Sequence, residues 1–202
     1  MVALKTVDTV RPSWCIKGSM KGIVFTEFLE MVERLFSAAM ADHIIGATPS
    51  RTQGAYTAVG NYDHTELAGM VAALSQATQV PIPDLMRSFG RHLAGRFAAT
   101  FGGFFANHDN TLDFLASVDA VIHVEVLKLY PDAQLPSLKV LQRSEQHLAL
   151  HYVSSRHLHD LALGLIEGAA AHYGGQILIA QQVLPDGSMR FDIRQAAHAA
   201  AD

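Results

Sequence analysis

Two short segments of the chain carry side chains that could bind a cofactor together. Residues 119–131, Asp-Ala-Val-Ile-His-Val-Glu-Val-Leu-Lys-Leu-Tyr-Pro, place His123 within an apolar helical pattern. Further along, Tyr152, Ser154 and Arg156 occupy alternate positions. A neutral imidazole can ligate a metal ion, and a guanidinium flanked by hydroxyls can hold carboxylates. One axial nitrogen and a polar clamp for two propionates are what a buried haem requires.

Each feature also has an ordinary structural explanation. A histidine on the flank of an apolar helix is typically a structural residue, and polar strips are common on the solvent face of antiparallel strands. On an extended strand, positions i, i+2 and i+4 project from the same face, so Tyr152, Ser154 and Arg156 are expected on one surface. The neighbouring Ser155 is expected to point away. Together, the two features favour a haem site over either structural explanation.

The composition limits the class of protein. The 202 residues are 50% hydrophobic and 17% charged, and the net charge is −4, so we expect one domain with a sizeable core. The sequence has no long basic run and no apolar stretch of the ~20 residues that a membrane helix needs, which disfavours nucleic-acid and membrane partners. A single cysteine, Cys15, excludes an internal disulfide framework and suits a reducing, cytoplasmic location.

Hydrophobic spacing predicts an α+β domain over residues 20–194, with a flexible extension at 1–19 and a disordered tail at 195–202. Helices are expected over residues 26–41, 65–78, 81–101, 112–130 and 157–173. Strands are expected over residues 138–141, 147–154, 176–184 and 189–194. We expect a loop over residues 42–62. This order predicts an N-terminal helical subdomain followed by a four-stranded antiparallel sheet with a helix packed on it.

Certain residues should end these elements or line their buried faces. Thr65 is a candidate N-cap, Gly102-Gly103 should end the third helix, and Pro131 the fourth. The fourth helix should bury one apolar stripe, with His123 on its flank: Leu115, Val118, Ile122, Val126 and Leu129.

Further short motifs accompany the candidate site. They are Met20-Lys-Gly, Pro81-Ile-Pro83, Phe89-Gly90, Val121-Ile-His-Val-Glu-Val, Lys128-Leu-Tyr-Pro131, Leu135-Pro136 and Gly164-Leu-Ile-Glu-Gly168. With them, residues 20–194 resemble the H-NOX family of haem nitric oxide/oxygen binding domains, which includes the sensor domain of soluble guanylate cyclase. The resemblance implies haem b between the helices and the sheet, with His123 as its proximal ligand. It also implies a propionate clamp of Tyr152, Ser154 and Arg156, with Pro136 pressing on the porphyrin.

The resemblance bears on the gas that is bound. Oxygen-binding members place a tyrosine five residues after the clamp arginine, and a tryptophan and an asparagine orient it. Here the corresponding positions hold Leu161, Phe28 and Leu93. With Phe97 and Leu165, these residues are expected to form an apolar distal pocket. Such a pocket offers no hydrogen bond to bound oxygen, whereas nitric oxide binds ferrous haem strongly without one.

The resemblance, with these apolar substitutions, therefore implies a haem-based sensor, not an enzyme, that binds nitric oxide and carbon monoxide and excludes oxygen. His92 and Tyr56 are the remaining candidate donors to a bound gas. The resemblance implies a separate partner, a histidine kinase or a cyclic-di-GMP enzyme, and signalling by rupture of the iron–His123 bond. Two alternatives stay open: a haem enzyme that consumes nitric oxide or peroxide, and a haem-free regulatory domain. An apolar pocket disfavours the peroxide enzyme, which needs a distal acid–base group.

Overall fold

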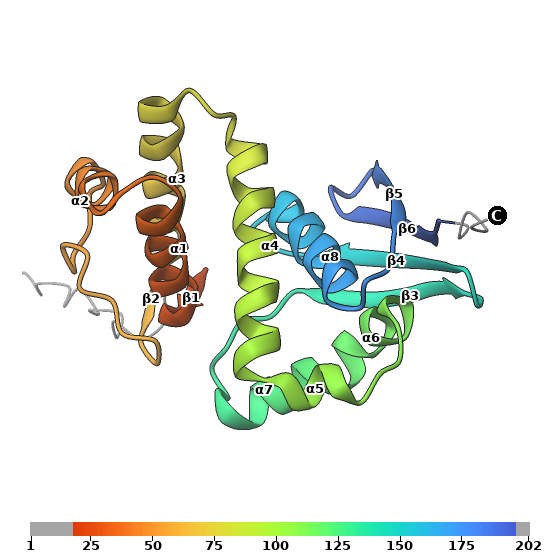
Figure 1. Ribbon diagram of the computed structural model, residues 1–202. Helices are drawn as coiled ribbons and strands as arrows, with labels where there is room; N and C mark the ends of the chain where they lie inside the picture. Colours follow the sequence, from red (N-terminus) through yellow and green to blue (C-terminus); the bar gives the residue numbers. More distant parts are fainter. Residues whose placement is uncertain (1–17, 197–202) are drawn as a thin grey trace, which may run out of the picture.

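The computed structural model describes residues 18–196. Its central element is the helix α4 (Ile82–Thr100), which separates two halves of the molecule (Figure 1). The N-terminal half contains β1 (Ser19–Lys21), α1 (Gly22–Leu35), α2 (Ala38–Ala47), β2 (Asn61–Asp63) and α3 (His64–Thr78). The C-terminal half contains α8 (His159–His172) and a sheet (Figure 1). No helix in the described range is long and apolar enough to span a membrane.

The expected flexible extension and disordered tail each include a residue that the structure places in a strand. Ser19 already belongs to β1, where it pairs with Asp63, and β6 (Met189–Gln195) extends to Gln195. The remaining residues of the two expected segments, 1–17 and 197–202, lie outside the described residues.

Local capping interactions divide the N-terminal helices differently from the predicted pattern. The helix expected over residues 26–41 is two helices, because Ser37 has an extended backbone and its side chain accepts a hydrogen bond from the Met40 amide. Residues 42–62 are only partly loop, since α2 extends to Ala47 and β2 begins at Asn61. Asp63, not Thr65, caps α3, and its carboxylate accepts from the Thr65 amide.

The sheet confirms the predicted α+β architecture. Strands β3 (Ser137–Arg143), β4 (His147–Val153), β5 (Ile177–Val183) and β6 form one antiparallel sheet in the order β3-β4-β6-β5. Alternate residues of β4 and β6 point toward α8 and form a core with it: Leu148, Leu150, Tyr152, Met189, Phe191, Ile193, Leu163 and Ile166. One face of the sheet is therefore covered by the helix that connects β4 to β5.

Glycines allow α4 and α8 to pack at very short range. A Cβ atom on Gly164 would lie 2.1 Å from the carbonyl oxygen of Arg87, and one on Gly90 would lie 2.3 Å from that of Leu161. Only glycine fits at such a close approach of two backbones. The contact joins the two hydrophobic cores, and Phe97 packs against both.

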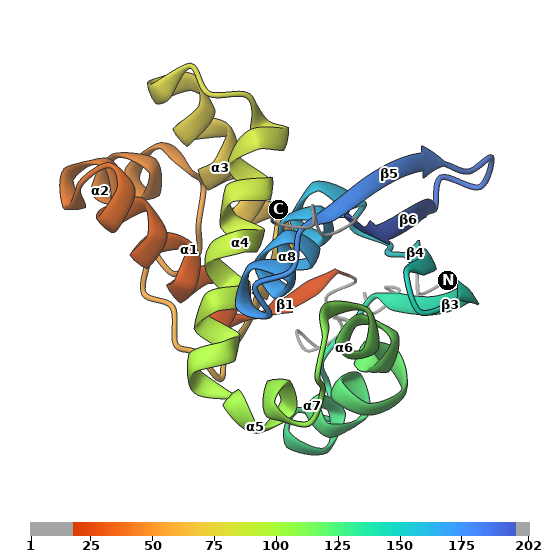
Figure 2. The ribbon, with the colours of Figure 1, turned by 45° about the vertical axis from the view of Figure 1, so that its right-hand side comes forward.

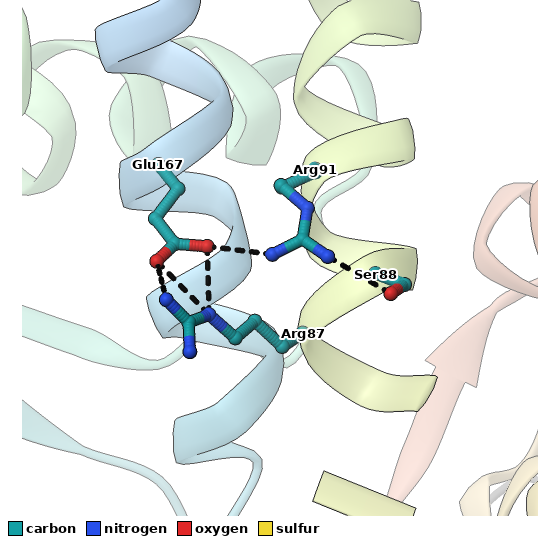
Figure 3. A network of polar contacts seen from close by, with 4 residues as sticks. All are labelled: Arg87, Ser88, Arg91 and Glu167. Carbon is teal, nitrogen blue, oxygen red and sulfur yellow. Dashed lines mark hydrogen bonds and ion pairs between the residues drawn. The ribbon is translucent and has the colours of Figure 1, made fainter. Parts of the chain in front are cut away.

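An ion-pair network fixes the exposed edge of the same contact (Figure 3). The Glu167 carboxylate on α8 accepts hydrogen bonds from Arg87 Nε at 2.9 and 2.8 Å and from Arg91 Nη1 at 2.8 Å. Arg91 also donates to the Ser88 hydroxyl at 2.9 Å. Both arginines belong to α4, so Glu167 fixes the axial position of α8 against it.

The segment that carries His123 is not one regular helix. It comprises α6 (Thr111–Ser117), a π-helical turn at Val118–Ile122 and α7 (His123–Leu129). The Gly102-Gly103 pair, which was expected to end the preceding helix, is itself the start of a further short helix, α5 (Gly102–Ala106). The expected buried stripe ends early: Leu115 is buried, whereas Leu129 is 64% exposed. The π-turn changes the face that later residues present, which the spacing alone does not reveal.

Candidate functional site

His123 lies immediately after the π-turn, with one ring nitrogen already engaged. Its Nδ1 atom lies 3.1 Å from Asp119 Oδ1, and the imidazole side chain is 17% exposed. This contact leaves Nε2 as the nitrogen available to a metal. Metal-ligating histidines typically have their other ring nitrogen held by a carboxylate or carbonyl in this way. Sequence spacing alone could not assign this role to Asp119.

The three residues expected on one strand face are arranged differently. Strand β4 ends at Val153, and Ser154 and Arg156 lie in the turn that follows it. The Arg156 amide donates to Ser154 Oγ at 3.2 Å, so the hydroxyl stabilises the turn. The strand alternation predicted for Arg156 is therefore wrong. Tyr152 does point into the core and is 6% exposed. Burial raises the pKa of its hydroxyl, against the opposing effects of Ser154 and the Arg156 charge.

The Arg156 guanidinium is half-buried and only partly satisfied. Nη1 donates to the Ser19 carbonyl at 2.8 Å, and Nη2 donates to the carbonyl of Gln134. Among the described residues, Nε has no hydrogen-bond partner, although it is buried, and no carboxylate lies within ion-pair distance of the side chain. Burial lowers the pKa of this group. A buried cation without a matching anion is costly, so the site suits a bound carboxylate.

The predicted distal residues gather beside α4. Phe28, Leu93 and Leu161 are buried in the N-terminal core at 0%, 3% and 8% exposure, and Phe97 and Leu165 pack against it. The Phe28 ring meets Phe89 edge-on at 5.2 Å between centroids. All five predicted residues are apolar.

The proximal residues adjoin the second core. Ile122, the neighbour of His123, packs against the cluster that contains Tyr152. Phe97 packs against this cluster as well as against the distal one. Pro136 is half-buried and directly precedes β3. Phe97 is thus shared by the core that holds the predicted distal residues and the core that holds Tyr152.

His92 is held in a buried polar cluster between α1 and α4. Arg34 Nη2 lies 2.8 Å from its Nδ1, and Glu27 Oε2 lies 3.2 Å from its Nε2. Because a guanidinium only donates, Nδ1 must accept and Nε2 must carry the hydrogen that Glu27 receives. Arg96 also donates to Glu27, at 2.8 Å. Burial lowers the pKa of His92, and the Arg34 charge acts in the same direction, against the raising effect of Glu27.

Neither of the remaining candidate donors is available to a bound gas. Both ring nitrogens of His92 are engaged by Arg34 and Glu27. The Tyr56 hydroxyl donates to Glu66 Oε2 at 2.9 Å. The hydrogens of these two side chains are therefore used within the N-terminal half.

Comparisons with known proteins define the class of the domain. The Haem-NO-binding family matches residues 21–181. The Fe(II) unliganded H-NOX protein from K. algicida is 34% identical, with a TM-score of 0.85, over 91% of this chain and 100% of that one. The H-NOX protein from S. oneidensis, in the Fe(II)NO ligation state, is 26% identical, with a TM-score of 0.81, over 88% and 99%. No curated protein sequence matches the chain significantly.

The chain therefore belongs to the Haem-NO-binding, or H-NOX, family. Members of this family bind haem and act as gas sensors, often with signalling partners.

Proposed function

We propose that the chain is a haem b sensor of nitric oxide that regulates a separate signalling protein in the cytoplasm. The observation that carries the proposal is the Arg156 guanidinium, whose buried Nε has no partner among the described residues. It lies in the turn that follows the strand with the buried Tyr152. This arrangement fits a haem propionate, which would satisfy the charge and the free donor together.

Several residues would hold the haem. His123 would supply the axial imidazole through Nε2, because Asp119 engages Nδ1. Tyr152, Ser154 and Arg156 would bind the propionates, and Pro136 would contact the porphyrin. When bound, ferrous haem supplies the iron to which a diatomic gas coordinates.

The distal residues favour nitric oxide and carbon monoxide over oxygen. Phe28, Leu93, Phe97, Leu161 and Leu165 carry no hydrogen-bond donor, and their apolar side chains exclude water from this side. Bound oxygen acquires partial negative charge and needs a donor, which this wall does not provide. His92 and Tyr56 do not replace it, because their donors are engaged elsewhere.

The output is proposed to pass through the helix that carries His123. No residue of α7 is buried, so the anchoring of His123 contributes much of what holds this helix. A change in that anchoring would shift α7 and alter the surface seen by the partner. A histidine kinase or a cyclic-di-GMP enzyme fits this role, and its activity should differ between gas-free and nitric-oxide-treated sensor.

An absorption spectrum of the purified, reduced chain tests the proposal directly. We expect a haem band that shifts with nitric oxide and with carbon monoxide and does not form a stable complex in air. His123→Gly should lose haem or retain it only with added imidazole, whereas His43→Gly, at an exposed position on α2, should not. Absence of haem would favour a haem-free domain, and sustained consumption of peroxide or nitric oxide would favour an enzyme.

A further inference from the structure

The helix α7 has few attachments of its own to the rest of the molecule. None of its residues is buried, and its apolar side chains Val124, Leu127 and Leu129 are 44%, 40% and 64% exposed. Its internal ion pair, Lys128 with Glu125 at 2.5 Å, stays within the helix. The position of α7 must therefore be set largely by the segments at its two ends.

The C-terminal end of α7 is tied to the N-terminal half by three polar residues. Lys21 Nζ lies 2.7 Å from Asp132 Oδ1, and Asn61 donates to the other carboxylate oxygen. The Lys21 ammonium also lies 5.2 Å from the ring centroid of Tyr130, the C-cap of α7. This distance is within the range of a cation–π contact. Lys21 and Asn61 face each other across the β1–β2 pairing, so one carboxylate holds both strands.

The burial of Lys21 makes this contact more than a surface ion pair. Its side chain is only 13% exposed, while that of Asp132 is 57% exposed. An ammonium that is largely removed from water needs its partner, and Lys21 finds one carboxylate and one aromatic face. Asp132 responds in turn, because Lys21 and Asn61 both lower the pKa of its carboxyl.

The same two segments are joined a second time by the candidate propionate clamp. Arg156 donates to the carbonyl of Ser19 in β1 and to that of Gln134 in the loop after α7. In the turned view, β1 extends from the N-terminal half toward the sheet side of the molecule (Figure 2). Lys21 is also the N-cap residue of α1, the helix that carries Phe28. The C-terminal end of α7, the helix that carries His123, is thus connected directly to the N-terminal end of α1.

We propose that Lys21, Asn61 and Asp132 form a latch that couples α7 to α1 and limits how far α7 moves when a gas binds. We call these three residues the Asp132 latch. They are positioning residues, since none of them belongs to the set that would touch the haem. The inference rests on the proposed function, because the movement that it restrains follows from the anchoring of His123.

The latch is tested with variants that remove one charge at a time from the full chain. Lys21→Met keeps the apolar stem and Asp132→Asn keeps the shape. The double variant Lys21→Glu with Asp132→Lys exchanges the charges. Lys128→Met is the matched control, because it removes the same charge from a pair that lies within α7. Thermal unfolding shows that each variant is folded before it is compared.

The first readout is amide hydrogen exchange of the gas-free protein, which does not depend on any gas response. The single variants should accelerate exchange about two- to fivefold in β1, β2 and residues 123–132, as expected for the loss of one partly exposed ion pair. The exchanged pair should restore slow exchange, and Lys128→Met should leave β1 and β2 unchanged. Equal exchange in the Lys21→Met variant and the control would overturn the proposal.

The second readout is the rate of the spectral change after mixing with nitric oxide. Loss of the latch should accelerate it several-fold relative to Lys128→Met, and the exchanged pair should return it toward the wild-type rate. If wild type shows no spectral change, the proposed function fails, while hydrogen exchange still decides whether the latch exists. If the exchange pattern is as expected but the gas response is the same in every variant, the latch is structural and the coupling is refuted.

Discussion

Gly164→Ala should destabilise the domain, although alanine is the better helix former. The new Cβ would lie 2.1 Å from the Arg87 carbonyl oxygen, where ordinary contact begins at 3.4 Å, so α4 and α8 must separate by roughly 1.3 Å. Overpacking of this kind costs about 1–3 kcal/mol, and opening the neighbouring contacts adds to it. Helix propensity offsets only about 0.5–1 kcal/mol. The net loss should be about 1–2 kcal/mol, or a Tm lower by roughly 2–8 °C.

The matched control for this variant is Gly95→Ala on the adjoining helix. A Cβ at Gly95 would meet nothing within 4 Å, so the same substitution should raise Tm by roughly 1–4 °C. Thermal unfolding of both variants, followed by circular dichroism on protein prepared identically, gives the comparison. Equal Tm values for Gly164→Ala and Gly95→Ala would refute the conclusion that backbone contact sets the spacing of α4 and α8.

Three further predictions concern the haem, the gas and pH. Arg156→Ala should release haem to a scavenging protein about ten- to a hundredfold faster than Ser155→Ala, because charge-assisted hydrogen bonds to the propionates are lost. Equal rates of haem release in the two variants would show that Arg156 is not part of the clamp. Leu161→Tyr should raise oxygen affinity several-fold, because it adds one neutral hydrogen-bond donor. Oxygen titration of the reduced protein measures this affinity. An oxygen complex that persists in the wild-type protein would contradict the proposal that the distal wall is apolar. Burial keeps the folded-state pKa of His92 below its ordinary value of 6.5, so its contribution to stability is complete above that pH and is lost as pH falls. Urea unfolding at a series of pH values from 7 downward should show that the free energy of unfolding falls more steeply in wild type than in His92→Gln. Parallel pH dependences of the two proteins would contradict this role of His92.

Strong local patterns in the sequence were enough to predict the main elements. The apolar spacing of Leu85, Phe89 and Leu93 predicts α4 because one face of a long helix is buried. The strands of the sheet are also well marked: β6 buries alternate residues at Met189, Phe191 and Ile193, and β4 is an apolar run that buries most of its residues. These elements lie near their predicted positions because each pattern spans several turns or pairs.

Features that depend on single residues or on distant segments were not predictable in this way. The π-turn before His123 has no compositional signal, and three-residue strands such as β1 are too short to show alternation. Arg156 was placed on a strand because spacing cannot show that β4 ends at Val153. Asn61 and Asp132 are separated by 71 residues, and nothing in either local sequence indicates that they meet.

The sharing of core residues between the two halves also governs how the chain folds during synthesis. Leu161, with Leu158 and Leu165, completes the core formed by α1, α3 and α4, although α8 is made long after these helices. At about 5–20 residues per second, the ribosome needs several seconds to extend the chain from the end of α4 to Leu165. Throughout that interval the side of α4 that packs against α8 lacks its partner and is open to chaperones or to other nascent chains. A fragment that ends after α4 should therefore aggregate, and the smallest cooperative folding unit extends through α8 to the last strand.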